Sequence, residues 1–332
     1  MNKKALGADA LLLLTACIWG FGFTAQRSGM EYIGPFAFNG IRFLLGSLSL
    51  FPLIFLRSRH IKNNEVRLSA QIKDILPGAF IAGNCIFIAV TLQQIGIMFT
   101  TAGNAGFITG LYVALVPVLG FFLGRKTGPV TWLGAIFTLA GLYFISTAGK
   151  PDKLNPGDML VAVSAIFWAM HVLLIDRLVK KSNPIILSSG QFLVCGIYSL
   201  AAAFLAEPFL AGQLRNLGHT GLFEWTPFTL LLRGLYSGII PLELAGGAVI
   251  PILYGGLASV GIAYTLQVIA QKNAPPAHAT IILCFEGCFA ALGGIILLNE
   301  TLGVFTLLGF ILMLSGMFAS QWELIFSKSH IT

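Results

Sequence analysis

The sequence predicts an all-α membrane protein with ten transmembrane helices, arranged as two inverted five-helix repeats around a central cavity. Three observations lead to this prediction. The 332-residue chain is 56% hydrophobic and only 10% charged, whereas a soluble globular protein carries about 25% charged residues. The apolar residues gather in stretches of spanning length, and the two halves of the chain match each other. This composition excludes a soluble enzyme and an intrinsically disordered chain.

Ten apolar stretches are each long enough to cross a bilayer, which takes about 20 residues. Helices are expected because a backbone inside hydrocarbon must satisfy its own hydrogen bonds. Runs such as Leu11 to Leu14 also lack the alternation of a membrane β-strand. The predicted spans are 8–27, 35–56, 74–94, 100–124, 130–148, 157–176, 185–206, 245–270, 276–298 and 303–325.

The basic residues are expected to set the orientation of the spans. With an even number of spans and the N-terminus inside, fourteen Lys and Arg residues lie on the cytoplasmic side and five on the outer side. This bias is typical of the positive-inside rule, so the net charge of +7 favours a membrane topology rather than nucleic-acid binding. We expect a protein of the cytoplasmic (inner) membrane with both termini in the cytoplasm. The alternative is a lipoprotein signal ending at Cys17, but Asp9 interrupts its apolar region.

The two halves of the chain are related in sequence. At an offset of 149 residues, Trp19 falls on Trp168 and Pro35 falls on Pro184. At an offset of 174, residues 88–93 (IAVTLQ) fall on residues 262–267 (IAYTLQ) with one difference. At an offset of 175, glycines and apolar residues of 131–141 fall on 306–316.

Each half therefore holds five spans, at residues 8–148 and 157–325. Because five is odd, the second half must cross the membrane in the opposite sense, as in many secondary transporters. The growing offset places an insertion near 208–244, on the outer face. Its apolar residues 228–240 are expected to lie along the membrane interface. An eleventh span there is the alternative, and it would destroy the inverse relation of the halves.

The chain resembles EamA-type carriers of the drug/metabolite transporter superfamily over about residues 8 to 325. The resemblance is carried by Ile18-Trp19-Gly20, Trp168, Gly134 and Ala140-Gly141 after Trp132, Glu286 followed by a small residue, and Asn299-Glu300. The family often has Glu-Pro in the ninth span, where this chain has Glu286-Gly287. The resemblance implies a secondary transporter that exports or exchanges a small metabolite or drug-like solute through a central cavity, without ATP.

Motifs for enzymatic chemistry are missing from the sequence. It contains no phosphate-binding Gly-x-x-x-x-Gly-Lys-Ser/Thr loop, no His-Glu-x-x-His and no Gly-x-Ser-x-Gly. The five cysteines lie in apolar runs without metal-ligand spacing, so neither a metal nor a cofactor is expected. The alternatives to a carrier are an intramembrane lipid-modifying enzyme and a channel or lipid scramblase.

Two charged residues inside spans are candidates for the substrate pathway. Glu286 lies about ten residues, or roughly 15 Å, into the ninth span, near the midplane. It is either a protonatable group that couples protons or binds a cationic substrate, or a protonated acid bonded to a neighbouring helix. Arg42 lies inside the second span, where it either snorkels to the outer interface or meets an anionic group or Glu286 in the pathway. Gln191 occupies the matching place in the second half.

Polar and aromatic residues at mid-depth complete the candidate pathway. Trp19 and Trp168 lie away from the interfaces where aromatic belts occur, so they are expected either to contact a flat substrate ring or to fill gaps between helices. His171 follows Trp168 by one turn and can share its face. Asn104 and Tyr112 are expected to share a face of the fourth span. Gln93 and Gln267, which end the repeated Thr-Leu-Gln, are expected to cap or bridge helices.

Overall fold

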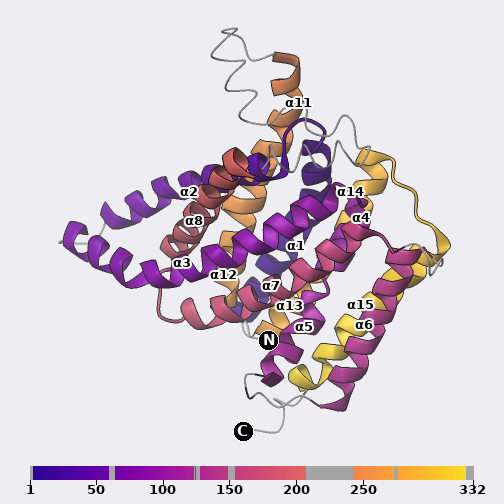
Figure 1. Ribbon diagram of the computed structural model, residues 1–332. Coiled ribbons are helices and arrows are strands. Elements are labelled where there is room, and N and C mark those ends of the chain that lie inside the picture. The colour runs from indigo at the N-terminus through magenta and orange to yellow at the C-terminus, as the bar shows by residue number, and fades with distance from the viewer. Residues whose placement is uncertain are drawn as a thin grey trace.

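The structure is a computed structural model that describes residues 3–59, 64–122, 124, 128–148, 154–206, 242–272 and 276–326. These residues form helices, with no strand among them (Figure 1). The first half contributes α1 (Lys3–Gly29), α2 (Pro35–Arg59), α3 (Asn64–Ile97), α4 (Ala102–Thr109), α5 (Tyr112–Phe122) and α6 (Pro129–Thr147). The second half contributes α7 (Pro156–Leu178), α8 (Pro184–Leu205), α11 (Leu242–Leu253), the π-helix η1 (Tyr254–Tyr264), α12 (Thr265–Gln271), α13 (Pro276–Leu283), α14 (Phe285–Leu298) and α15 (Val304–Phe326).

Each of the ten predicted spans is occupied by helix, but three of them are not simple α-helices. The fourth divides into α4 and α5 at Gly110, and the ninth divides into α13 and α14 at Cys284. The eighth runs as α11, η1 and α12, with a π-helix in its middle. Within the described residues, nine stretches are long and apolar enough to cross a membrane, and Val304–Ala319 of α15 is a shorter apolar stretch.

Proline and asparagine begin several of these helices. Pro156 and Pro184 occupy the first turns of α7 and α8, where the missing N–H costs nothing. Asn155 precedes α7 and accepts hydrogen bonds from the backbone nitrogens of Gly157 and Asp158. Asn183 caps α8 in the same way, through the nitrogen of Ile185. The paired Asn-Pro sequences therefore fix where both helices start.

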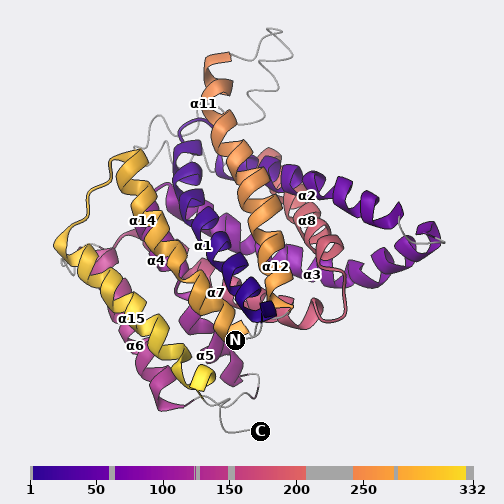
Figure 2. The same cartoon turned by 180° about the vertical axis from the view of Figure 1, so that it is seen from behind.

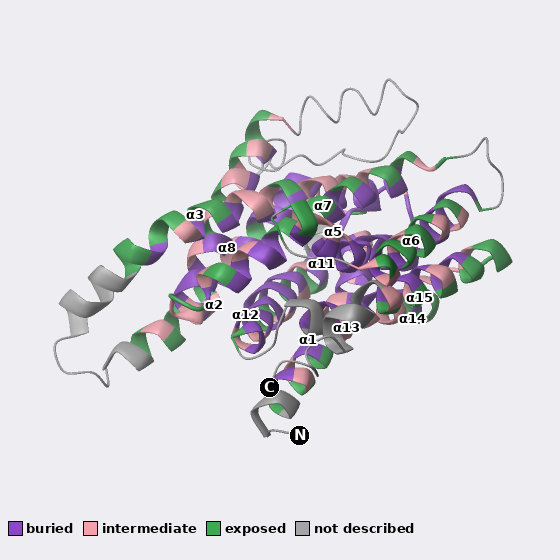
Figure 3. Ribbon diagram, turned by 90° about the horizontal axis from the view of Figure 1, so that it is seen from below, coloured by how far each residue is buried: buried purple, intermediate pink, exposed green. Residues whose placement is uncertain are grey.

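The surface of the bundle is strongly apolar. Leu205 and Val304 are each 83% exposed, Ile250 is 76% exposed and Phe122 is 74% exposed. Figure 3 shows exposed residues along outer helices such as α3, α6 and α15, while buried residues gather toward the centre. Such a surface suits hydrocarbon rather than water, and the chain is a multi-pass membrane protein.

The last span of the first half packs against the last span of the second half. A Cβ atom on Gly141 of α6 would lie 2.6 Å from the carbonyl oxygen of Gly309, and one on Gly316 of α15 would lie 2.5 Å from that of Gly134. The glycines let the two backbones touch, as small residues do in membrane bundles. Because the earlier glycine of one helix meets the later glycine of the other, α6 and α15 run antiparallel, side by side in Figure 2.

The second spans of the two halves, α2 and α8, form another antiparallel pair. Ser47 donates to the carbonyl oxygen of Ser189 at 2.9 Å, while Gly40 packs against Leu200. The start of α1 and the end of α15 lie on the same side of the molecule, which agrees with an even number of crossings (Figures 1 and 2). The predicted insertion at 208–244 lies almost entirely outside the described residues.

Candidate functional site

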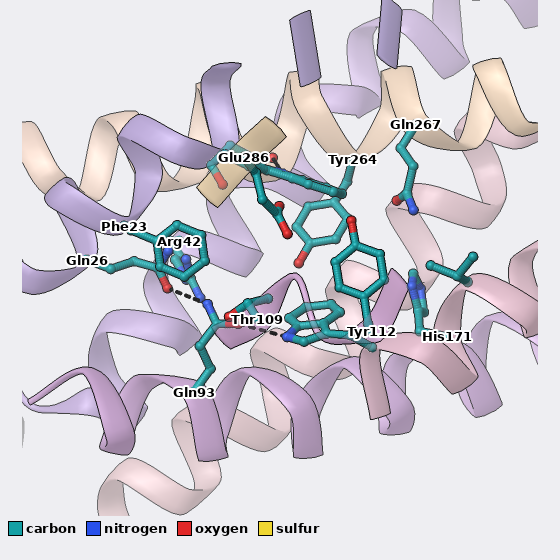
Figure 4. A pocket seen from close by; sticks show the side chains of 14 residues that line it. Phe23, Gln26, Arg42, Gln93, Thr109, Tyr112, His171, Tyr264, Gln267 and Glu286 are labelled. Atoms are coloured by element: carbon teal, nitrogen blue, oxygen red, sulfur yellow. Dashed lines mark hydrogen bonds between the residues drawn. The ribbon is translucent and has the colours of Figure 1, made fainter. Parts of the chain in front are cut away.

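A pocket lies between helices of both halves, in the middle of the bundle. Figure 4 shows the fourteen side chains that line it. They come from α1, α2, α3 and the α4–α5 region of the first half, and from α7, η1, α12 and α14 of the second. The lining residues are Trp19, Phe23, Gln26, Arg42, Gln93, Thr109, Tyr112, Trp168, His171, Val172, Ser259, Tyr264, Gln267 and Glu286.

Six of the seven residues singled out from the sequence line this pocket, namely Trp19, Arg42, Tyr112, Trp168, His171 and Glu286. Asn104 does not line it. Asn104 and Tyr112 are not on one continuous α-helix, because α4 ends at Thr109 and α5 starts at Tyr112. The backbone nitrogen of Asn104 is instead bonded to Thr101, the N-cap of α4.

Arg42 is buried rather than extended toward the interface. Its side chain is 3% exposed, and its Nε donates to Oδ1 of Asn39 at 3.0 Å. The guanidinium carbon lies 5.4 Å from the centre of the Phe38 ring and 5.1 Å from that of Phe43, both cation–π distances. Snorkelling to the outer interface is therefore wrong for Arg42. The aromatic rings and Asn39 hold the cation at the pocket wall.

Glu286 is also buried, with 2% of its side chain exposed. It lies in the first turn of α14, directly after the break at Cys284. Its Oε1 has no hydrogen-bond partner, although it is inaccessible. In Figure 4 the side chains of Glu286 and Tyr112 point into the same space.

Tyr264 lies at the centre of an aromatic cluster. Its ring centre is 4.5 Å from that of Trp19, 6.0 Å from that of Trp168 and 6.5 Å from that of His171. Tyr264 is not among the residues predicted from the sequence. The sequence does single out this position. The repeated segments 88–93 and 262–267 differ only here, with Val90 in the first half and Tyr264 in the second.

A hydrogen-bond network centred on Gln93 joins α3 to α1 and α7. Nε1 of Trp168 donates to Oε1 of Gln93 at 2.7 Å, and Nε2 of Gln93 donates to Oε1 of Gln26 at 3.3 Å. The hydroxyl of Thr109 makes a weaker contact with Oε1 of Gln93 at 3.4 Å. Gln93 thus bridges helices as expected, whereas Gln26 was not predicted because a lone glutamine near a helix end carries no distinguishing pattern.

His171 is fixed by a residue of the neighbouring helix. Its Nε2 lies 3.0 Å from Oε1 of Gln191 in α8, and its ring centre lies 6.1 Å from that of Trp168. Both side chains belong to α7 and share a face, as their spacing predicts. Among the described residues, no group of three His, Cys, Asp or Glu side chains has the arrangement of a metal site.

Comparison with known proteins adds a family relationship to this geometry. The profile of the EamA-like transporter family matches residues 6–147, 155–240 and 236–320. An uncharacterized transporter of Archaeoglobus fulgidus is 28% identical over 300 residues, covering 90% of this chain and 80% of the relative. The uncharacterized transporter YoaV of Bacillus subtilis is 23% identical over 330 residues, covering 97% and 98% of the two chains.

Two further relatives extend the comparison. The uncharacterized inner membrane transporter YedA of Escherichia coli K12 is 24% identical over 233 residues, covering 67% of this chain and 71% of the relative. One solved crystal structure superimposes with a TM-score of 0.61 at 15% sequence identity, covering 98% of this chain and 99% of the other. This last likeness concerns the fold alone.

Proposed function

Since this chain belongs to the EamA-like transporter family, we propose that it is a secondary carrier that moves a small metabolite or drug-like solute by alternating access through the central pocket. It is a transporter rather than an enzyme. The carrier exports or exchanges its solute across the cytoplasmic membrane, and the loop charges support the position of both termini inside. The related inner membrane transporter YedA supports the same membrane.

The contacts between helices support the two-repeat architecture that this mechanism requires. If the halves were exchanged by a twofold rotation, the pair α3–α7 would become η1–α1, and the pair α3–α8 would become η1–α2. The pairs α5–α7 and α14–α1 would likewise exchange. Each of these pairs is in contact, while α6–α15 and α2–α8 map onto themselves. This is the pattern expected of inverted repeats that rock about a shared midplane site.

One observation carries the proposal: two buried ionisable side chains, Arg42 and Glu286, face the same pocket from different halves. Burying charges away from water is costly unless a partner compensates. A structural core could have used apolar residues at both places. A polar solute that enters the pocket can pair with Arg42 or Glu286, while Trp19, Trp168 and Tyr264 offer flat apolar surfaces to a ring.

Glu286 is the candidate for proton coupling. It is the pocket's carboxylate, and its Oε1 has no protein partner. Such a carboxyl group can bind a proton in one conformation. In the other conformation it releases the proton and either binds a cationic substrate or stays empty. The flux of protons is then coupled to the flux of the substrate. This role depends on Glu286 changing its protonation during the transport cycle.

Purified protein in liposomes tests the proposed function. A thermal-shift screen against a metabolite library first identifies compounds that bind the folded state, because a ligand raises the melting temperature by mass action. Carrier activity predicts that a stabilising compound shows saturable flux, reduced by substitution of Arg42 or Glu286. Non-saturable flux would instead identify a channel or scramblase, and product formation from labelled lipid precursors would identify an enzyme.

A further inference from the structure

The two halves of the pocket differ in how their tryptophans are bonded. In the second half, Trp168 donates to Oε1 of Gln93 at 2.7 Å. Trp19 is the counterpart of Trp168, and Gln267 is the counterpart of Gln93. An ideal twofold relation would therefore bond Trp19 to Gln267. Instead, Nε1 of Trp19 donates to the carbonyl oxygen of Ser259 at 3.2 Å.

Gln267 is left without the bond that its counterpart makes. It lines the pocket, only 1% of its side chain is exposed, and its Oε1 has no hydrogen-bond partner. An unsatisfied buried acceptor destabilises the state that contains it. In Figure 4, Gln26 and Gln93 lie at one side of the pocket, and Gln267 and His171 lie at the other. The two glutamines thus face the substrate space in different bonding states.

The backbone around Gln267 differs in the same way. The eighth span is π-helical over Tyr254–Tyr264, whereas the matching residues 80–90 of α3 are α-helical. Ser259, whose carbonyl accepts from Trp19, lies within this π-helix. The two halves therefore differ both in the type of helix at this place and in the hydrogen-bond partner of the tryptophan.

One end of the bundle is bonded across the two halves. Near the start of α4, Thr100 donates to Oδ1 of Asp158, and Asn155 donates to the carbonyl oxygen of Phe99 at 3.0 Å. These bonds join the first half to the second at one end of the bundle. The conformation described here therefore combines bonds across the halves at this end with one formed tryptophan–glutamine pair.

We propose that the two tryptophan–glutamine pairs form alternately during transport. In the conformation described here, Trp168 holds Gln93 and leaves the amide oxygen of Gln267 for the substrate. In the oppositely facing conformation, Trp19 leaves Ser259 and holds Gln267, while Trp168 releases Gln93 to the substrate. Gln93 and Gln267 are then specificity-determining residues that accept a hydrogen bond from the same N–H or O–H donor group of the solute in turn. This inference rests on the proposed function.

The exchange balances the two states. Each conformation contains one tryptophan–glutamine bond and one unpaired glutamine oxygen, so the two glutamines favour neither state, although Trp19 also bonds the carbonyl of Ser259 in the conformation described here. A substrate with a donor group satisfies the unpaired oxygen in either state. Near-equal free energies allow a carrier to alternate, because a solute can shift an equilibrium only by its difference in affinity for the two states.

Matched substitutions test the exchange through the accessibility of the pocket. Val172 lines the pocket outside the polar network, so Val172→Cys in a background without other cysteines serves as the reporter. A small membrane-impermeant thiol reagent is applied to either face of sealed vesicles, and the ratio of the two labelling rates is measured. Gln93→Met removes the acceptor of Trp168 and destabilises the conformation described here. Gln267→Met removes the acceptor proposed for Trp19 and destabilises the opposite conformation. We expect the ratio to move about fivefold in opposite directions.

Two further variants separate the exchange from general destabilisation. Trp168→Phe removes the same bond as Gln93→Met, so it must shift the ratio in the same direction. Gln94→Met is the control, because Gln94 is a buried neighbour of Gln93 that donates to the backbone of Gln26 and does not line the pocket. It is expected to lower the melting temperature without changing the ratio.

The outcomes distinguish this inference from the proposed function. If Gln93→Met and Gln267→Met shift the ratio in the same direction, or not at all, the exchange is wrong. Trp168→Phe provides an independent measurement of the same bond should one glutamine variant fail to fold. Saturable flux by the wild-type protein would still support a carrier if the exchange is wrong. Labelling of the Val172→Cys reporter from one face only, with no saturable flux, would instead overturn the carrier itself.

Discussion

The carboxylate of Glu300 accepts a 2.6 Å hydrogen bond from the backbone nitrogen of Ala102, although nearly two hundred residues separate them. Its second oxygen accepts from the nitrogen of Gly103 at 3.1 Å. Glu300 thus caps the N-terminus of α4 from the other half of the chain. Asn299 makes this possible because it adopts a left-handed conformation, with φ of 53°, that ends α14 and turns the chain toward α4.

Glu300→Ala should destabilise the protein by about 1–3 kcal/mol, because it leaves two backbone N–H groups of α4 without an acceptor and removes a charge that favours a helix N-terminus. The measurement is the unfolding midpoint in mixed detergent. Thr301→Ala is the control, since Thr301 is exposed and its change should be within about 0.5 kcal/mol. Equal effects of the two variants would contradict the role of the cap.

Gly20→Ala should be strongly destabilising, because a Cβ there would overlap Cβ of Phe289 and lie 2.7 Å from the backbone oxygen of Glu286. The helices α1 and α14 would have to separate, at a cost of about 1–3 kcal/mol or more. Gly7→Ala in the same helix meets no atom within 4 Å, and should be neutral or stabilise by up to about 1 kcal/mol. Thermal unfolding of both variants checks the contrast, and a stable Gly20→Ala protein would contradict this close packing.

Arg42→Lys should not preserve the function of Arg42, although the positive charge is kept. The planar guanidinium lies near the Phe38 and Phe43 rings and bonds Asn39, and the compact ammonium of lysine cannot reproduce this geometry. We expect substrate flux to fall about tenfold or more in Arg42→Lys, as one lost charge-assisted hydrogen bond implies. Flux into liposomes measures it, with the melting temperature as a check on folding. Wild-type flux in Arg42→Lys would show that charge alone suffices.

Glu286→Gln should remove the pH dependence of transport, because the amide has nearly the shape of the carboxylate but does not take up a proton in the physiological range. The measurement is the initial rate of flux across a range from about pH 5.5 to about pH 8.5, which brackets neutrality. Glu286→Asp is the matched variant, since it keeps a carboxyl group and should keep a pH-dependent rate. If Glu286→Gln retains both the flux and its dependence on pH, proton coupling through this residue is excluded.

Much of the fold followed from hydropathy alone. The ten apolar stretches all became helices because a spanning backbone has few other ways to satisfy its hydrogen bonds. The breaks at Gly110 and Cys284 did not follow from the hydropathy. A hydropathy pattern averages over a span and is insensitive to a local turn, which explains why Asn104 and Tyr112 were expected on one continuous helix.

The candidate site was predictable where chemistry is unusual for a membrane. Arg42, His171 and Glu286 are costly in hydrocarbon, so their presence inside spans pointed to an interior position. Gln26 and Ser259 carry no such signal, because uncharged polar side chains are common between membrane helices. Their places at the pocket depend on the crossing of α1 with η1 and α3.

The amino-acid sequence alone determined that this chain enters a bilayer as a helical bundle in two related halves, because the cost of exposing polar backbone to hydrocarbon leaves little choice. Only the tertiary structure decided which buried groups are paired: Trp168 with Gln93, and Trp19 with a backbone carbonyl instead of Gln267. Hydrogen bonds depend on differences of less than an ångström between atoms of distant helices, and packing of the whole bundle sets those distances.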